Sequence, residues 1–162
     1  MRNLRLDVCY DGTRYKGWQR LAGADQTIQG KLEQTLTRLL GEPIEVSGSG
    51  RTDAGTHARG QVVSFQCNST MSCEEILDGL RQYLPEDIGV ISCKNTSPRF
   101  HARLNAKTKT YCYRVWVGEN PAYSKENTCI LTAGHWMYRK SDRRLKITLV
   151  RMIFLRSAVI KI

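Results

Sequence analysis

The sequence lacks any apolar run that approaches the roughly 18 residues of a membrane-spanning helix. Its first residues also lack the apolar core of a secretory signal peptide, because Arg5 and Asp7 interrupt the apolar residues there. These two absences exclude the usual signatures of a membrane protein and of a secreted protein. We therefore expect a cytoplasmic protein that does not associate with a membrane.

Patterns that bind zinc or nucleotides are also missing. None of the six cysteines belongs to a C-x-x-C pair, and the three histidines are far apart in the sequence. Without a signal segment, we expect buried thiols rather than three disulfides. The glycines form no G-x-x-x-x-G-K-[ST] loop, and the third glycine and following helix of the dinucleotide fingerprint are absent. The sequence therefore predicts no zinc site and no nucleotide cofactor.

Acidic residues are scarce relative to basic ones. The chain has 15 Asp and Glu against 25 Lys and Arg, which gives a net charge of +10, and its pI is about 9.6. Such a balance suggests a polyanionic partner, most simply nucleic acid. The excess is uneven, because residues 119–162 carry +6 of the total and residues 1–118 carry +4.

The sequence does contain a clear succession of apolar patterns. Alternating apolar residues predict strands, and apolar residues at three- and four-residue steps predict helices. Gly41 and Pro43 fit the end of the first helix, Ser72 and Glu75 form a capping box for the second, and Pro85 ends it. The expected strands are residues 4–10, 44–48, 61–66, 88–93 and 108–117, and the expected helices are residues 27–40 and 73–84.

This order, β-α-β-β-α-β followed by one more strand, is typical of an α+β ferredoxin-like fold. We therefore expect an antiparallel sheet with both helices on one face, which leaves the other face for a ligand or a second domain. Residues 122–141 show no clear period. Residues 145–162 are apolar with scattered Arg and Lys, and they fit either a pair of strands or a basic amphipathic helix.

The most informative stretch is the glycine-rich segment 47–58, which connects two expected strands. Its glycines let the backbone adopt unusual conformations or approach a ligand closely, and reactive residues often lie on such loops. Asp53 lies there, two residues after Arg51. A carboxylate beside a guanidinium keeps a low pKa, stays ionised and can attack an electrophilic carbon. In the alternative interpretation, Asp53 accepts backbone N–H bonds and shapes the turn.

The two basic residues of this segment also have alternative interpretations. Arg51 is suited to hold a phosphate or to orient Asp53, and it is equally suited to a structural ion pair with Asp53. His57 is suited to acid–base chemistry or to a phosphate contact, and the alternative is a loop residue with ordinary hydrogen bonds.

Two further segments mix aromatic and basic residues. The composition of residues 10–20 is typical of a surface that stacks on bases and neutralises phosphates, and the alternative is a hairpin loop with a packed Trp18. The second segment carries Arg103 and is followed by the strand with Tyr111. Tyr111 is suited to stack on a ring or to exchange a proton, or else it is a core residue of that strand.

These motifs together resemble those of the TruA-type tRNA pseudouridine synthases. They occur in the family's order between residues 4 and 118. The matching motifs are Tyr10-Asp11-Gly12, Gly17-Trp18-Gln19, Gly50-Arg51-Thr52-Asp53-Ala54-Gly55-x-His57-Ala58-x-Gly60-Gln61-Val62, Phe100-His101-Ala102-Arg103 and Tyr111.

The resemblance implies a function and roles for several residues. It implies an isomerase that converts uridine to pseudouridine in the anticodon stem-loop of tRNA, at positions 38–40, without a cofactor or a metal. Asp53 falls on the catalytic aspartate. Arg51 falls on the arginine that pairs with this aspartate and helps flip the base. Tyr111 falls on the tyrosine that stacks on the uracil and is a candidate to take the C5 proton. We add His57 and Arg103 as candidate contacts to the substrate.

The resemblance also implies a homodimer in which each subunit has two α/β domains with the catalytic cleft between them. We expect residues 1–118 to be the N-terminal domain with the catalytic loop. Residues 119–162 are an atypical basic tail, which we expect to be truncated or read out of frame, because the charge shifts and the periodicity is lost there. The alternatives are a basic RNA-binding module without catalysis and an inactive fragment.

Overall fold

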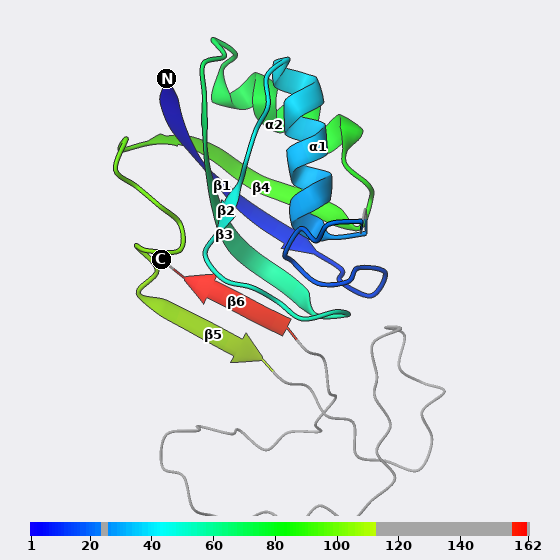
Figure 1. Ribbon diagram of the computed structural model, residues 1–162. Coiled ribbons are helices and arrows are strands. Elements are labelled where there is room, and N and C mark those ends of the chain that lie inside the picture. Colours follow the sequence, from blue (N-terminus) through cyan, green and yellow to red (C-terminus); the bar gives the residue numbers. More distant parts are fainter. Residues whose placement is uncertain (24–25, 113–156, 162) are drawn as a thin grey trace, which may run out of the picture. The chain divides into compact units, whose positions relative to one another are not determined.

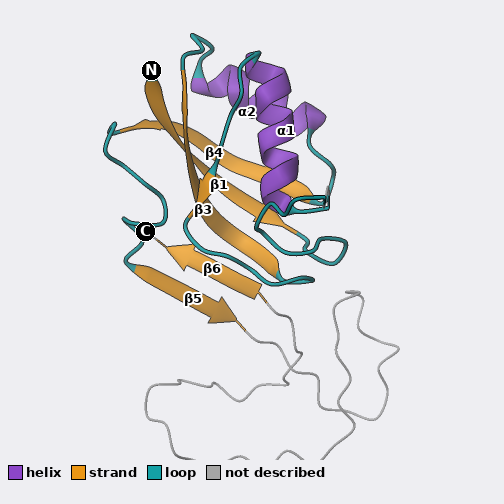
Figure 2. Ribbon diagram, in the orientation of Figure 1, coloured by secondary structure: helices purple, strands orange, loops and turns teal. Residues whose placement is uncertain are grey.

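The computed structural model describes residues 1–23, 26–112 and 157–161. Figures 1 and 2 show a β-sheet with both helices packed on one of its faces. The predicted α+β ferredoxin-like fold is therefore confirmed. In chain order the elements are β1 (Arg2–Tyr10), α1 (Ile28–Leu40), β2 (Ser47–Gly48), β3 (His57–Cys67), α2 (Cys73–Tyr83), β4 (Ile88–Thr96), β5 (Thr108–Cys112) and β6 (Ser157–Lys161).

Strand β1 lies between β3 and β4 in the order β4-β1-β3-β6-β5 and runs antiparallel to both. The outer edge of β3 is shared by two strands. Strand β2 pairs antiparallel with residues 63–64, and β6 pairs parallel with the beginning of β3, where Ser157 lies opposite His57. Strand β5 completes this side by pairing antiparallel with β6.

The core lies between the sheet and the two helices. Thr27 caps α1 by accepting a hydrogen bond from the Gly30 N–H, and Gly41 ends the helix in the left-handed conformation. The predicted capping box of Ser72 and Glu75 is present at the start of α2. The apolar sides of both helices pack on the sheet, and Leu39, Leu40 and Leu77 at the margin of this core are only partly buried. Buried core residues include Leu4, Leu6, Val8, Ile28, Leu32, Leu36, Val63, Phe65, Ile76, Leu80 and Val90.

The predicted strand at 44–48 is shorter than expected, since only Ser47 and Gly48 pair with β3. Ile44 and Val46 are buried, but their N–H groups donate to α1 side chains instead, at 3.0 Å to Thr37 Oγ1 and 3.0 Å to Glu33 Oε1 respectively. This helix-directed bonding removes those residues from the sheet.

The other boundaries also differ from the prediction. Strand β3 begins at His57, four residues before the expected start. For the strand predicted at 108–117, residues 113–117 lie outside the described residues, as does the segment 122–141. Of the tail at 145–162, residues 157–161 form a strand, so the helical alternative is wrong for that stretch.

The face of the sheet opposite the helices is partly covered by residues 97–105, which corrects the expectation that it is left free. Because side chains alternate along a strand, Asn3 and Ser64 point away from the helices. Asn3 Nδ2 donates to the carbonyls of Ser97 and Phe100, both at 2.8 Å. Ser64 Oγ accepts the N–H of Ala102 at 3.0 Å. These two buried polar residues therefore fix the course of the crossing segment.

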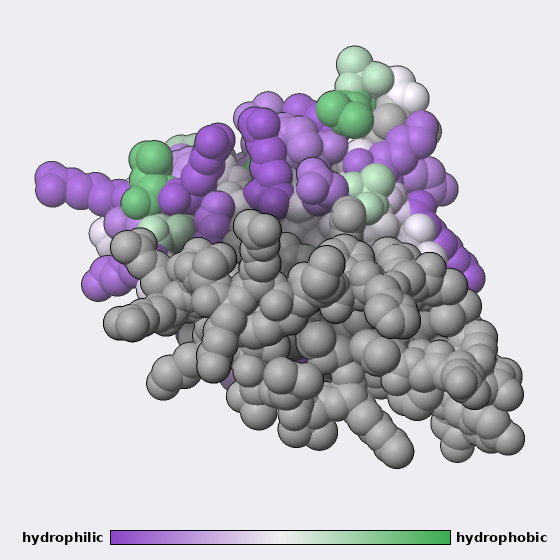
Figure 3. Space-filling model, turned by 90° about the horizontal axis from the view of Figure 1, so that it is seen from below, coloured by the Kyte–Doolittle hydropathy of each residue, from purple (hydrophilic) through white to green (hydrophobic). Residues whose placement is uncertain are grey.

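The surface of the described residues is mainly polar. Hydrophilic side chains predominate on the described part of the face shown in Figure 3. Large exposed apolar side chains come from separate segments and include Leu21, Tyr83, Ile91 and Leu104. No helix in the described residues is long and apolar enough to cross a membrane.

The four cysteines whose side chains are described carry free thiols. They are Cys9, Cys67, Cys73 and Cys93. Burial raises the pKa of the Cys93 thiol to about 12, and the neighbouring Cys73 thiol adds to the shift. The expectation of thiols rather than disulfides is confirmed for these four residues.

Candidate functional site

The glycine-rich loop spans residues 49–56, between β2 and β3. Its start is fixed to β3 by the Ser49 N–H, which donates to the Val62 carbonyl at 2.8 Å. Its end is a turn in which the Thr56 N–H donates to the Asp53 carbonyl at 3.1 Å. The backbone of Asp53, rather than its carboxylate, therefore closes this turn.

A second segment, residues 11–18, packs directly against the loop. The Trp18 N–H donates to the Thr52 carbonyl at 3.0 Å. Gly17 adopts a φ of +97°, and a Cβ there would lie 2.6 Å from the Thr52 carbonyl oxygen. A Cβ on Gly12 would lie 2.0 Å from the Thr56 carbonyl oxygen. Glycine is therefore required at both positions for the two backbones to touch.

A buried hydrogen-bond network supports the loop from below. The Tyr10 hydroxyl donates to Gln61 Oε1 at 2.9 Å and contacts Thr52 Oγ1 at 2.8 Å. Gln61 Nε2 donates to the Gly50 carbonyl at 2.9 Å. Burial raises the pKa of Tyr10 to about 12, although the Thr52 hydrogen bond opposes this shift. The phenol therefore stays protonated at neutral pH, and the network holds the residues on both sides of Arg51.

Asp53 and Arg51 are both exposed at the top of this support. Within residues 1–23 and 26–112, no hydrogen bond or ion pair involves the Asp53 carboxylate. The expected ion pair between Arg51 and Asp53 is thus not formed in the described residues.

His57 is the first residue of β3 rather than a loop residue, and it lies against the preceding segment. Its Nδ1 is 3.0 Å from Asp11 Oδ1 and 3.3 Å from the Gly12 nitrogen. Burial opposes ionisation of Asp11, but hydrogen bonds from Thr13 outweigh it, and with His57 and Arg14 they lower the pKa of this carboxyl. His57 therefore has structural partners that are distant in the sequence, which is why the sequence did not reveal them.

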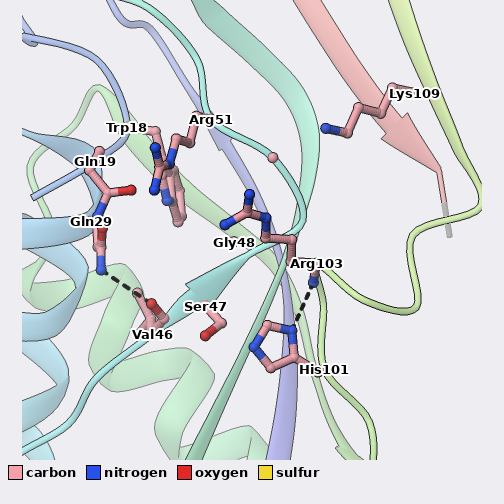
Figure 4. Close-up of a pocket in the computed structure, with 11 residues that line it drawn as sticks. Trp18, Gln19, Gln29, Val46, Ser47, Gly48, Arg51, His101, Arg103 and Lys109 are labelled. Atoms are coloured by element: carbon pink, nitrogen blue, oxygen red, sulfur yellow. Dashed lines mark hydrogen bonds between the residues drawn. The ribbon is translucent and has the colours of Figure 1, made fainter.

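Beside the loop lies a cavity of about 430 Å³ at the β2 side of the sheet. Arg51 lines it together with Arg103, which comes from the crossing segment, and Lys109, which comes from β5 (Figure 4). Among the described residues, no acidic side chain lines this cavity, and neither Asp53 nor His57 does. Its lining residues are Trp18, Gln19, Gln29, Val46, Ser47, Gly48, Gly50, Arg51, His101, Arg103 and Lys109.

The structure therefore brings together two of the predicted site residues, Arg51 and Arg103, and keeps His57 apart. Tyr111 lies on β5, two residues after Lys109, but its side chain is outside the described residues. In the described residues no group of three or more His, Cys, Asp or Glu could hold a metal ion.

The aromatic residues of segment 10–20 are buried. Tyr10 and Tyr15 are each 5% exposed, and Trp18 is 2% exposed. They are part of the hydrophobic core, so the packed alternative is correct and the base-stacking interpretation of these rings is wrong. Their apolar surface gains more from burial under the loop than from a place in solvent.

Three residues with evident roles were assigned none from the sequence, although His101 and Gln61 belong to the motifs quoted above. His101 and Lys109 line the cavity, and Gln61 holds the loop. For Gln61 a signal exists in the sequence, because it occupies the same side of β3 as Val63 and Phe65, where an apolar residue is expected. A polar residue at such a position indicates a buried hydrogen-bond partner.

Comparison with known proteins identifies relatives along most of the described chain. A family model described as tRNA pseudouridine synthase matches residues 8–105. The chain is 49% identical over 116 residues to tRNA pseudouridine synthase A of Bacillus sp. (strain KSM-64), covering 72% of this chain and 48% of that protein. It is 46% identical over 120 residues to tRNA pseudouridine synthase A 2 of Bacillus cereus (strain ZK / E33L), covering 74% and 49%.

A third relative is tRNA pseudouridine synthase A 1 of Clostridium tetani (strain Massachusetts / E88), 52% identical over 115 residues, which are 71% of this chain and 47% of that protein. The chain thus spans about half the length of the curated relatives it matches.

Proposed function

Because this chain belongs to the tRNA pseudouridine synthase family, we propose that it isomerises uridine to pseudouridine in tRNA, with Asp53 as the nucleophile. The observation that supports this most is the state of the Asp53 carboxylate. It is exposed and has no described partner, while the loop that carries it is fixed on both sides. A carboxylate presented on a rigid support is ready to attack without prior rearrangement.

The reaction begins with the target uridine leaving its base stack, at a cost of about a few kcal/mol. Arg51 then fills the vacated space or holds the backbone, since its guanidinium suits both tasks. Asp53 attacks either the ribose C1′ or the uracil C6, and both courses remain open.

In either course the N1–C1′ bond breaks, the ring turns and a C5–C1′ bond forms. The bond from Asp53 to C1′ or C6 then breaks or has been displaced, so the carboxylate is regenerated. The proton that leaves C5 is balanced by the proton that N1 gains, so the reaction is an isomerisation that consumes no cofactor. We propose Tyr111 as the group that stacks on the uracil and accepts the C5 proton.

Our more detailed proposals concern the target and the assembly. We propose that the targets are uridines of the anticodon stem-loop at positions 38–40, that the protein works in the cytoplasm and that it forms a homodimer. The support is the resemblance of the sequence motifs to the TruA-type tRNA pseudouridine synthases, together with the excess of basic residues. Chemical mapping of pseudouridine in tRNA, cell fractionation and sedimentation equilibrium test these three statements in turn.

We also propose that the unit characteristic of the family ends near residue 118 and that residues 119–162 are a distinct basic segment. The support is compositional, because this segment carries +6 of the net charge of +10. The coding DNA tests the accompanying hypothesis of a shifted frame. If no other reading frame beyond codon 118 encodes a sequence similar to the second domain of the family, the hypothesis of a shifted frame is wrong.

The decisive experiment measures tritium release from tRNA labelled at C5 of uridine. The variant Asp53→Asn keeps the size of the side chain and removes the nucleophile. Its matched control is Asp78→Asn, which changes a carboxylate that is 77% exposed on α2. We expect the wild type and the control to release tritium at similar rates and Asp53→Asn to release none.

The second candidate function is tRNA binding without catalysis, which the basic cavity favours. It predicts that the wild type binds tRNA but releases no tritium. If Asp53→Asn releases tritium at the same rate as the wild type, Asp53 is not the nucleophile.

A further inference from the structure

The imidazole of His101 is held in one orientation by its own turn. Its Nδ1 accepts the N–H of Arg103 at 3.2 Å and the N–H of Leu104 at 3.4 Å. A ring nitrogen that accepts N–H bonds carries a lone pair, so the proton of the neutral ring is on Nε2. His101 therefore offers an Nε2–H donor at the wall of the cavity without carrying a charge.

The turn that carries His101 is itself fixed. The His101 N–H donates to Asn105 Oδ1 at 2.8 Å, and the His101 carbonyl accepts the Asn105 N–H at 2.9 Å. The neighbouring Ala102 is fully buried and its N–H is bound by Ser64 of β3. Little conformational entropy is therefore lost when this donor meets a ligand.

Three cations share the cavity with this donor. Arg51, Arg103 and Lys109 line it from three separate segments (Figure 4), and none of them forms an ion pair within the described residues. By contrast, Arg20, which follows the lining residue Gln19 in the chain, forms an ion pair with Glu33 at 2.8 Å. No carboxylate is among the described residues of the lining, so these three cations give it a positive potential that favours an anion.

We propose that this cavity binds one backbone phosphodiester of the RNA substrate, with His101 Nε2–H as a neutral donor and Arg103 and Lys109 as the charged contacts. The identity of the RNA rests on the proposed function, whereas the preference for a phosphodiester rests on the lining. Gly50 and Arg51 line the cavity and Asp53 does not, so the bound phosphate lies beside the reacting nucleotide rather than on it.

The first test measures binding of a synthetic anticodon stem-loop RNA by fluorescence anisotropy at several salt concentrations. Arg103→Ala and Lys109→Ala are each expected to lower the slope of log affinity against log salt by about 0.7 to 0.9. The matched controls are Arg81→Ala on α2 and Lys94→Ala on β4, whose exposed cations lie outside the cavity lining. They are expected to leave the affinity near that of the wild type.

The variant His101→Asn distinguishes the two roles of His101, as a hydrogen-bond donor in the cavity and as the acceptor that stabilises its own turn. Asparagine places its oxygen near the position of Nδ1 and can still accept the N–H groups of Arg103 and Leu104, but it has no donor near the position of Nε2. We expect it to weaken RNA binding about tenfold, as loss of a hydrogen bond to a charged group does. Because His101 is neutral, the salt slope is expected to stay unchanged.

A second set of RNAs identifies the phosphate. Each carries one uncharged methylphosphonate linkage at a different position. At one position the methylphosphonate is expected to weaken RNA binding to the wild type by about tenfold. It is expected to have little effect on binding to Arg103→Ala, because that variant already lacks the guanidinium that contacts the phosphate. If every position affects the two proteins equally, or if the three cavity variants bind like the two controls, the proposal is overturned.

These outcomes are distinguishable from a failure of the proposed function. If one methylphosphonate position weakens binding to the wild type but not to Arg103→Ala, and the wild type releases no tritium, the phosphate site is supported and the proposed catalysis is refuted. If the wild type releases tritium and the cavity variants bind RNA like the controls, catalysis is supported and the phosphate site is refuted.

Discussion

Replacing Gln61 tests whether the buried network positions the catalytic loop. The side chain is fully buried, accepts from Tyr10 and donates to the Gly50 carbonyl. Gln61→Met keeps the length of the side chain and removes both hydrogen bonds. Tyr10 can turn its proton to Thr52 at 2.8 Å, but the buried Gly50 carbonyl loses the partner that holds it.

One buried carbonyl without a partner costs about 1–3 kcal/mol, and we expect Gln61→Met to lower the free energy of unfolding by this amount. Urea denaturation followed by tryptophan fluorescence measures it. The matched control is Gln66→Met on the same strand, where the side chain is exposed, and its effect is expected to stay within about 0.5 kcal/mol.

The reasoning also predicts an energetic coupling. Tyr10→Phe removes the other end of the same hydrogen bond, so the double variant is expected to be more stable than the sum of the two effects implies, by about 0.5 kcal/mol or more. At pH 7 and without denaturant, the rate of tritium release by Gln61→Met is expected to fall by about 10-fold to 100-fold, because the loop that carries Arg51 loses its support. Additive effects of the two substitutions, or a Gln61→Met protein as stable as Gln66→Met, would refute the reasoning.

Two further predictions follow from the loop and its neighbours. Gly17→Ala places a Cβ 2.6 Å from the Thr52 carbonyl oxygen at a φ of +97°, whereas Gly41→Ala meets nothing within 4 Å at a φ of +70°. In urea denaturation we expect the free energy of unfolding to fall by about 1–2 kcal/mol for Gly41→Ala and by clearly more for Gly17→Ala. Equal losses in the two variants would exclude the close approach at Gly17. The pKa of Asp11 is lowered in the folded state, so its contribution to stability is present above its ordinary pKa and is lost as the pH falls through the lowered value. Thermal melting from pH 6 to pH 2 is expected to show a shallower acid-induced decline for Asp11→Asn than for the wild type, and identical profiles would contradict the hydrogen bonds and the His57 contact assigned to this carboxyl.

The helices and the central strands were predictable from the sequence because their signals are local. Apolar residues repeat at helical steps through Ile28, Leu32 and Leu36, and the caps at Thr27 and Ser72 mark the starts of the two helices. The shortened β2 was not predictable, since Ile44 and Val46 have the alternation of a strand and only their bonds to α1 remove them from the sheet.

The candidate site divides in the same way. The sequence alone determined that a glycine-rich loop presents Arg51 and Asp53 after a strand, because turn chemistry depends on residues that are neighbours in the chain. Only the tertiary structure decided that Arg51 and Asp53 form no ion pair within the described residues, that His57 contacts Asp11, and that His101, Arg103 and Lys109 meet Arg51 at one cavity. The physical reason is distance along the chain. Local periodicity indicates which side of an element is buried, whereas partners fifty residues apart are chosen by strand register and by how the segment crossing the sheet is held.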